Sequence, residues 1–155
     1  MTSVTVGAAA PDFDLATDDG TVSLAGLKGK KVVLYFYPKD DTPGCTKEAL
    51  GFTALAADFA AADTVVIGVS KDTIARHAKF RGKYDLAVKL ASDPDGAVIE
   101  RYGSWIEKSL YGRQYMGIDR STFLIGRDGR IAQIWRKVKV PGHAEAVLAA
   151  AKALG

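Results

Sequence analysis

The longest apolar runs of the chain are two stretches of strand length. KKVVLYFY at residues 30–37 and TVVIGVS at residues 64–70 are rich in β-branched and aromatic residues and hold few polar positions. Such a run is typical of a strand covered on both faces, because a half-exposed strand alternates apolar and polar residues. The pattern therefore predicts two buried strands of a central sheet.

Shorter strands are expected in pairs near the two ends of the chain. Residues 11–24 predict two strands around an Asp-Asp-Gly turn, where Gly20 can adopt a positive φ. Residues 121–135 predict a hairpin around Arg-Asp-Gly. The first of these pairs would form a small N-terminal hairpin.

Helical patterns separate the strands. Apolar residues recur at i, i+3, i+4 and i+7 from Phe52 to Phe59, which predicts one helix over about residues 43–61. Residues 104–116, rich in glycine and tyrosine, are expected to form a functional or covering loop. The other predicted helices are residues 73–83 with Asp72 as the cap, a short helix after the turn in SDPDGAVIERYG, and residues 143–154.

This order of elements predicts a three-layer α/β fold. The sheet would be mixed, and right-handed crossovers would place helices on both of its faces. The 155 residues contain no repeat and no linker long enough to separate two units. Residues 1–155 are therefore expected to form a single domain.

Composition narrows the classes of function. Hydrophobic residues make up 48% of the chain and charged residues 25%, which excludes a disordered or fibrous protein. A net charge of +3 is too weak to indicate nucleic-acid binding. No apolar run reaches the roughly 18 residues of a membrane span, and the N-terminus shows no secretion signal. A single cysteine fits a reducing compartment, so we expect a cytoplasmic protein.

No metal or cofactor is expected. His77 and His143 stand alone, match no metal-binding spacing and are predicted to be solvated. Stretches such as GLKGKK lack the phosphate-loop pattern.

The only cysteine, Cys45, lies where a buried strand gives way to a helix. Pro38 ends the strand, Thr42 is a favourable N-cap, and Pro43 suits the first helical position. Cys45 would then be the third helical residue, among amides without helical partners and at the positive end of the helix dipole. Both effects favour the thiolate, which is the nucleophilic form, and Gly44 leaves room for a reagent. The alternative is that Cys45 is a small buried hydrophobe.

The segment around Cys45 also resembles a known family. The run Pro38-x-x-x-Thr42-x-x-Cys45 resembles the active-site signature of peroxiredoxins. YFYPKDDTPGCTKEA is similar to the peroxiredoxin Q branch, also called bacterioferritin comigratory protein. APDFDL, SDPDGAVIERYG and GIDRSTFLIGRDGRI follow in the family's order, so the resemblance covers almost the whole chain. It implies a thioredoxin-like fold and a peroxidase that reduces hydrogen peroxide and organic hydroperoxides.

The resemblance implies a role for each matching residue. Cys45 would be the peroxidatic cysteine, whose thiolate attacks a hydroperoxide and becomes a sulfenic acid. Thr42 would direct its hydroxyl at the thiolate and the peroxide, and Pro38 would shield the sulfur from water. Arg120 matches the family's active-site arginine and would stabilise negative charge as the O–O bond breaks, although from composition alone it would be a surface strand residue. Glu48 would orient Arg120 by an ion pair or remain a solvated carboxylate.

The substrate pocket is less well defined by the sequence. In the family the region of residues 104–116 covers or lies near the active site. Trp105 and Tyr111 would line an apolar pocket for organic hydroperoxides beside Gly44, or would simply pack, and packing is favoured.

The chain departs from its family in having no second cysteine. The positions where relatives carry a resolving cysteine hold Leu50 and, in the following helix, a residue near Arg81. Cys45 cannot form a disulfide within its own chain, so an external thiol must reduce its sulfenic acid. Thioredoxin, glutaredoxin and glutathione all stay open as reductants. The Q branch is often monomeric, and we expect a monomer.

Two other functions stay open at this point. A peroxide-sensing protein would relay oxidation of Cys45 to a partner and would stall after one reaction. In a non-catalytic thioredoxin-like domain Cys45 would merely pack, and Cys45→Ser would leave peroxide consumption unchanged. A Cys-x-x-Cys disulfide oxidoreductase is excluded, because Thr42 occupies the place of the first cysteine.

Overall fold

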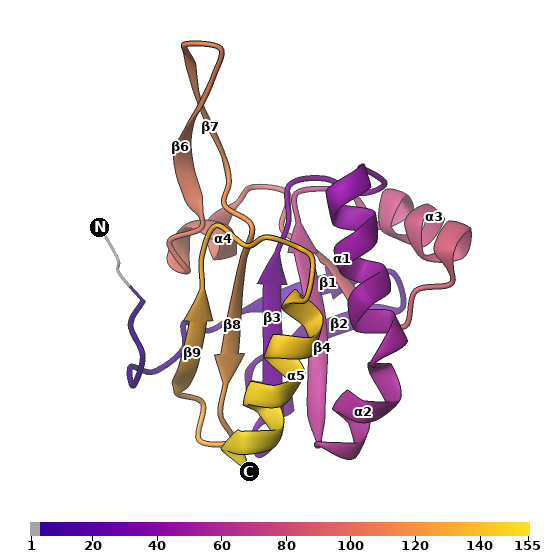
Figure 1. Ribbon diagram of the computed structural model, residues 1–155, viewed down its shortest axis with the longest axis vertical. Helices are drawn as coiled ribbons and strands as arrows, with labels where there is room; N and C mark the ends of the chain where they lie inside the picture. Colours follow the sequence, from indigo (N-terminus) through magenta and orange to yellow (C-terminus); the bar gives the residue numbers. More distant parts are fainter. Residues whose placement is uncertain (1–3) are drawn as a thin grey trace.

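A seven-stranded mixed sheet forms the centre of residues 4–155, the part of the chain that the computed structural model describes. The strand order is β2-β1-β5-β4-β3-β8-β9, so β3 lies between β4 and β8 (Figure 1). β3 runs parallel to β4 and antiparallel to β8. The strands are β1 (Asp14–Thr17), β2 (Gly20–Ser23), β3 (Lys31–Phe36), β4 (Thr64–Ser70), β5 (Lys89–Ser92), β8 (Ser121–Ile125) and β9 (Ile131–Trp135).

The two faces of the sheet carry separate apolar cores. Alternate residues of β3 point to opposite faces, so Val32 and Leu34 join one core and Val33 and Tyr35 the other. All six residues of β3 are buried, which confirms the prediction of a doubly covered strand. The prediction of a second buried strand at residues 64–70 is also confirmed, since β4 has these bounds and no exposed residue.

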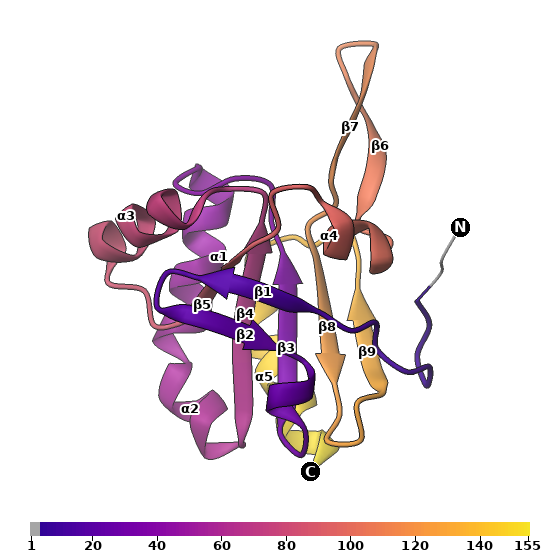
Figure 2. The same cartoon turned by 180° about the vertical axis from the view of Figure 1, so that it is seen from behind.

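Helices cover both faces, as the sequence predicts. The longer helices lie on one face of the sheet. The short 3-10 helix η1 and α4 lie over the other face, together with the β1–β2 hairpin, which pairs with β5 and crosses in front of β3 and β4 (Figures 1 and 2). The helical elements are η1 (Ala25–Leu27), α1 (Pro43–Ala54), α2 (Ala56–Ala61), α3 (Ile74–Tyr84), α4 (Ala97–Arg101) and α5 (His143–Leu154).

Two local predictions are wrong, and one strand was missed. The helix expected over residues 43–61 breaks at Leu55, whose φ of −103° and ψ of 12° leave the helical region. The cap of α3 is Thr73, whose hydroxyl accepts a hydrogen bond from the Arg76 amide, and not Asp72. Strand β5, only four residues long, was not predicted.

The stretch expected to be a loop forms a two-stranded hairpin. β6 (Trp105–Leu110) pairs with β7 (Arg113–Ile118), and the hairpin projects beyond the rest of the molecule (Figures 1 and 2). Its tip residues, Tyr111 and Gly112, both have positive φ, at 51° and 77°. A two-residue hairpin turn needs this conformation, which Tyr-Gly signals more weakly than Asn-Gly or Asp-Gly.

Both histidines are buried, which corrects the prediction that they are solvated. His77 is 0% exposed and contacts Asp40, and His143 is 7% exposed with Nε2 2.8 Å from the Thr122 hydroxyl. Burial, together with the charge of Arg120, lowers the pKa of His143 to about 4. Within residues 4–155, no group of His, Cys, Asp and Glu could hold a metal ion. The same residues include no helix long and apolar enough to cross a membrane.

Candidate active site

Cys45 lies in the first turn of α1, the helix that follows β3 along the chain. The chain leaves β3, turns through Asp41 at a φ of 59°, and enters the helix from the extended residue Thr42. The amide of Thr46 donates to the Thr42 carbonyl oxygen over 2.9 Å, so the amides that precede it in the helix have no helical acceptor. Cys45 therefore occupies the positive end of α1, as expected, and it is only 1% exposed.

Thr42 occupies the N-cap position without making the cap hydrogen bond. Its hydroxyl donates to the Lys39 carbonyl oxygen over 2.8 Å, and no side-chain bond to the helix amides forms. The hydroxyl oxygen therefore keeps its acceptor capacity. Thr42 is half-buried, and Pro38 follows β3 as an exposed residue.

Arg120 connects Cys45 to Glu48. It lies between β7 and β8, and its Nη2 is 3.3 Å from Cys45 Sγ. Its Nη1 donates to Glu48 Oε1 over 2.7 Å, one turn further along α1. The backbone carbonyl of Arg120 accepts a hydrogen bond from the Val138 amide over 2.8 Å. Arg120 is thus held at its backbone and at two nitrogens of its guanidinium group.

Burial shapes the electrostatics of this group. Burial raises the pKa of Glu48 to about 7, although Arg120 pulls in the opposite direction. Burial alone would lower the pKa of Arg120, but Glu48 and Cys45 outweigh it and raise that pKa above its ordinary value. Arg120 therefore stays charged beside the sulfur.

Gly44 makes room for this arginine. A Cβ atom added at Gly44 would lie 3.1 Å from Arg120 Nη2, which is closer than most Cβ contacts in proteins. The sequence suggested that Gly44 leaves space for a reagent. In the structure, the guanidinium fills part of that space.

The other two expected pocket residues do not meet Cys45. Tyr111 is 99% exposed at the hairpin tip, so it neither lines a pocket nor packs, which corrects both expectations. Trp105 is half-buried, packs against the core and carries Lys71 Nζ 4.6 Å from its ring centroid. Packing is therefore the arrangement observed for Trp105.

Lys108 of β6 is a residue that sequence reasoning missed. It is half-buried, and burial lowers the pKa of its ammonium group, with the charge of Arg120 adding to this effect. The negative charges of Asp119 and Cys45 act in the opposite direction. No signal in the sequence pointed to Lys108, because its strand was expected to be a loop.

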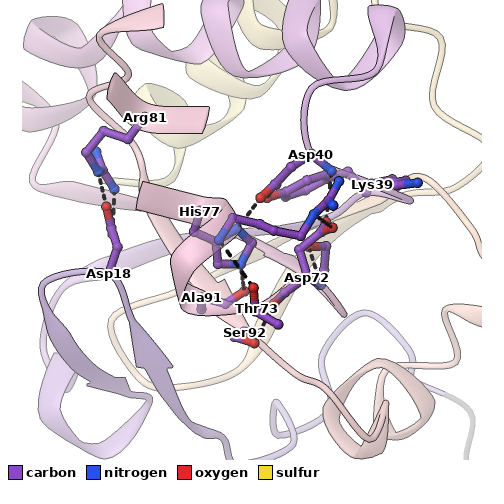
Figure 3. Close-up of polar contacts among 12 residues, drawn as sticks. Asp18, Lys39, Asp40, Asp72, Thr73, His77, Arg81, Ala91 and Ser92 are labelled. Atoms are coloured by element: carbon purple, nitrogen blue, oxygen red, sulfur yellow. Dashed lines mark hydrogen bonds and ion pairs between the residues drawn. The ribbon is translucent and has the colours of Figure 1, made fainter. Parts of the chain in front are cut away.

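The two positions where relatives carry a resolving cysteine differ in their surroundings. Leu50 lies within the continuous helix α1 and is 39% exposed. Arg81 of α3 binds the Asp18 carboxylate through two nitrogens and donates to the carbonyl oxygens of Leu86 and Val88. Arg81 therefore anchors the end of α3 to the β1–β2 turn (Figure 3).

Comparison with known proteins places the chain in a family. The sequence model of the AhpC/TSA family matches residues 6–134. The chain is 52% identical to the putative peroxiredoxin bcp of Coxiella burnetii, over 94% of this chain and 97% of the relative. It is 48% identical to peroxiredoxin Bcp of Bacillus subtilis, over 91% and 90% of the two chains.

Solved structures show the same relationship. A bacterioferritin comigratory protein of Xanthomonas campestris, described with alkyl peroxide reduction activity, superposes with a TM-score of 0.89 at 45% identity, covering 97% of this chain and 96% of the other. Peroxidoxin BcpB of Mycobacterium tuberculosis superposes with a TM-score of 0.85 at 33% identity, covering 98% and 99%. The match over nearly the whole chain, together with its single cysteine, shows that this protein belongs to the AhpC/TSA family as a thiol-dependent peroxidase of the peroxiredoxin Q branch, without a resolving cysteine.

Proposed function

We propose that Cys45 is the residue that reduces the peroxide, and that Arg120, Thr42, Pro38 and Glu48 assist it. One observation carries this assignment: a guanidinium from 75 residues away lies 3.3 Å from the only thiol sulfur of the chain. A cation at that distance stabilises a thiolate and the negative charge of the reaction's transition state. Glu48 supports the assignment because it holds Arg120 from the other side.

The first step oxidises Cys45. Its thiolate attacks the terminal oxygen of a hydroperoxide, the S–O bond forms and the O–O bond breaks. The sulfur becomes a sulfenic acid, and the departing oxygen takes up a proton to leave as water or an alcohol. In our proposal Arg120 stabilises the departing oxygen, Thr42 offers its hydroxyl group to the peroxide, and Pro38 limits the approach of water.

The second step needs a thiol from outside. A thiolate attacks the sulfenic sulfur and releases water, which leaves a mixed disulfide, and a further thiol then regenerates Cys45. Thioredoxin, glutaredoxin and glutathione each provide this chemistry. The Xanthomonas campestris relative reduces alkyl peroxides, and we propose organic hydroperoxides as substrates here beside hydrogen peroxide.

We further propose that residues 1–155 act as a single monomeric unit in the cytoplasm. The absence of any cysteine partner supports a reducing compartment, where external thiols are abundant.

Steady-state peroxide consumption tests the proposal. The wild type should turn over hydrogen peroxide many times with an external thiol, and Cys45→Ser should lower the rate to that of the thiol alone. Arg113→Ala, on the exposed hairpin, serves as the matched control. A single stoichiometric reaction would favour the sensor, and an active Cys45→Ser variant would disprove the assignment.

A further inference from the structure

A buried polar cluster outside the contacts of Cys45 connects the loop before α1 with α3 (Figure 3). Asp40 lies in that loop, two residues before Thr42, and is 3% exposed. Its Oδ2 lies 2.7 Å from Nδ1 of His77, which is 0% exposed. The Tyr37 hydroxyl donates to Asp40 Oδ1 over 2.5 Å. None of these three residues takes part in the steps described above.

The partners of His77 determine how many protons the pair holds. Nε2 lies 2.9 Å from the Ala91 carbonyl oxygen, which can only accept, so Nε2 carries a proton. The contact between Nδ1 and Asp40 Oδ2 then requires a second proton, on the ring or on the carboxyl group. A neutral imidazole beside an ionised carboxylate would leave one of the two contacts as an acceptor facing an acceptor. The pair of His77 and Asp40 therefore holds one proton more than a neutral imidazole and an ionised carboxylate would hold together.

Further hydrogen bonds connect the same loop to α3 and to Asp72, which lies just before the N-terminus of α3. The Asp40 amide donates to Asp72 Oδ2 over 2.8 Å. The Asp41 carboxylate accepts from Lys83 Nζ over 2.9 Å and from the Tyr84 hydroxyl over 2.8 Å. Lys83 and Asp41 are exposed, whereas the contact between Asp40 and His77 is fully buried. A buried hydrogen bond that water cannot replace resists opening more strongly than an exposed one.

We propose that Asp40 and His77 are positioning residues for Cys45, which share one buried proton and so clamp the loop of residues 38–42 onto α3. This inference rests on the proposed function of Cys45. The clamp keeps Thr42 and the first turn of α1 in place, and therefore keeps Cys45 Sγ beside Arg120. Because Cys45 is only 1% exposed, the thiol reductant needs this same segment to open. The clamp thus favours oxidation of Cys45 and slows its reduction.

Three variants separate these effects. His77→Leu removes both hydrogen bonds, and Asp40→Ala removes the carboxylate. Asp40→Asn can still donate to Nδ1 of a neutral His77 and accept from Tyr37, so it keeps the clamp without the extra proton. Lys79→Ala, an exposed change on the same helix, is the control.

The measurements are stopped-flow oxidation by hydrogen peroxide, reduction of the sulfenic acid by glutathione, and amide hydrogen exchange. We expect His77→Leu to slow oxidation about tenfold, to speed reduction and to raise exchange in residues 39–46 but not in β3 or β4. Asp40→Asn should stay within about threefold of the wild type in oxidation, whereas Asp40→Ala should match His77→Leu. Nitrogen NMR of the wild type should show a proton on Nε2 of His77.

Three results would overturn the inference: unchanged oxidation in His77→Leu, exchange that rises uniformly across the sheet, or equal rates in Asp40→Asn and Asp40→Ala. If His77→Leu does not fold, the comparison of the two Asp40 variants decides. A wild type that consumes no peroxide would contradict the proposed function instead, while hydrogen exchange and NMR would still test the clamp.

Discussion

At the residue scale, the site depends on one guanidinium that serves two partners. Arg120 donates to Cys45 Sγ with one nitrogen and to Glu48 with another. A planar fork with fixed directions suits this double contact, and lysine could not reproduce it. Glu48 therefore helps to fix the position of Arg120, although its own hydrogen bond is to Arg120 and not to the sulfur.

Replacement of Glu48 tests this dependence. In Glu48→Gln the amide oxygen can still accept from Arg120 Nη1, so oxidation of Cys45 should stay within about threefold of the wild type. Glu48→Leu has a similar volume but no acceptor, and it should slow oxidation by about tenfold or more. Stopped-flow reaction with hydrogen peroxide measures both rates. Equal rates for the two variants would show that Glu48 does not position Arg120.

At the element scale, the sequence predicts the regular parts and misses the irregular ones. The apolar runs identify β3 and β4, and the alanine-rich pattern gives the bounds of α5. The break at Leu55 is invisible in the pattern, because Phe52 and Phe59 still share one face, with ring centroids 5.8 Å apart. The β6–β7 hairpin was missed because its strands are largely exposed, and its turn carries a tyrosine at positive φ.

Two glycines of α1 give a matched pair of predictions. Gly44→Ala should slow oxidation of Cys45 about tenfold, because its Cβ would press on Arg120 Nη2 at 3.1 Å. At Gly51 an added Cβ would meet only the Ala144 Cβ, at 3.4 Å. Gly51→Ala should therefore leave the rate unchanged and raise the free energy of unfolding by about 1 kcal/mol, because alanine favours the helix.

Stopped-flow kinetics and urea unfolding of both variants test this pair. A slower Gly51→Ala variant, or an unaffected Gly44→Ala variant, would contradict the prediction that only the Cβ at position 44 disturbs Arg120.

At the scale of the whole molecule, the site joins segments that no local pattern connects. Arg120 and Cys45 are 75 residues apart, so only the family resemblance could pair them. Neither the sequence pattern nor the family resemblance indicated the contact between Asp40 and His77. An isolated histidine in a polar helix is instead predicted to be solvated. Contacts of this kind depend on how the sheet brings α1, α3 and β8 together.

Two buried groups should make the free energy of unfolding depend on pH in opposite directions. The pKa of His143 falls from 6.5 to about 4 on folding, so its contribution to stability is lost as the pH falls through that range. The pKa of Glu48 rises from 4.5 to about 7, so its contribution is lost as the pH rises through that range. The two contributions partly cancel in the wild type.

Single variants should reveal each dependence. Relative to the wild type, His143→Gln should lose stability as the pH rises from 4.5 to 6.5, and Glu48→Gln should gain stability over the same range. Urea unfolding across this range measures both differences. Parallel curves for all three proteins would show that neither group titrates differently in the folded and unfolded states.

The most direct test of the account is the rate at which hydrogen peroxide oxidises Cys45 in the wild type and in Arg120→Met, followed by stopped flow near neutral pH. If the guanidinium holds the negative charge of the thiolate and of the breaking O–O bond, its removal should slow the reaction by about 100-fold or more. The unfolding midpoint should change far less than the rate. Oxidation of Arg120→Met at the wild-type rate would contradict the claim that the pairing of Arg120 with Cys45 is what makes this sulfur reactive.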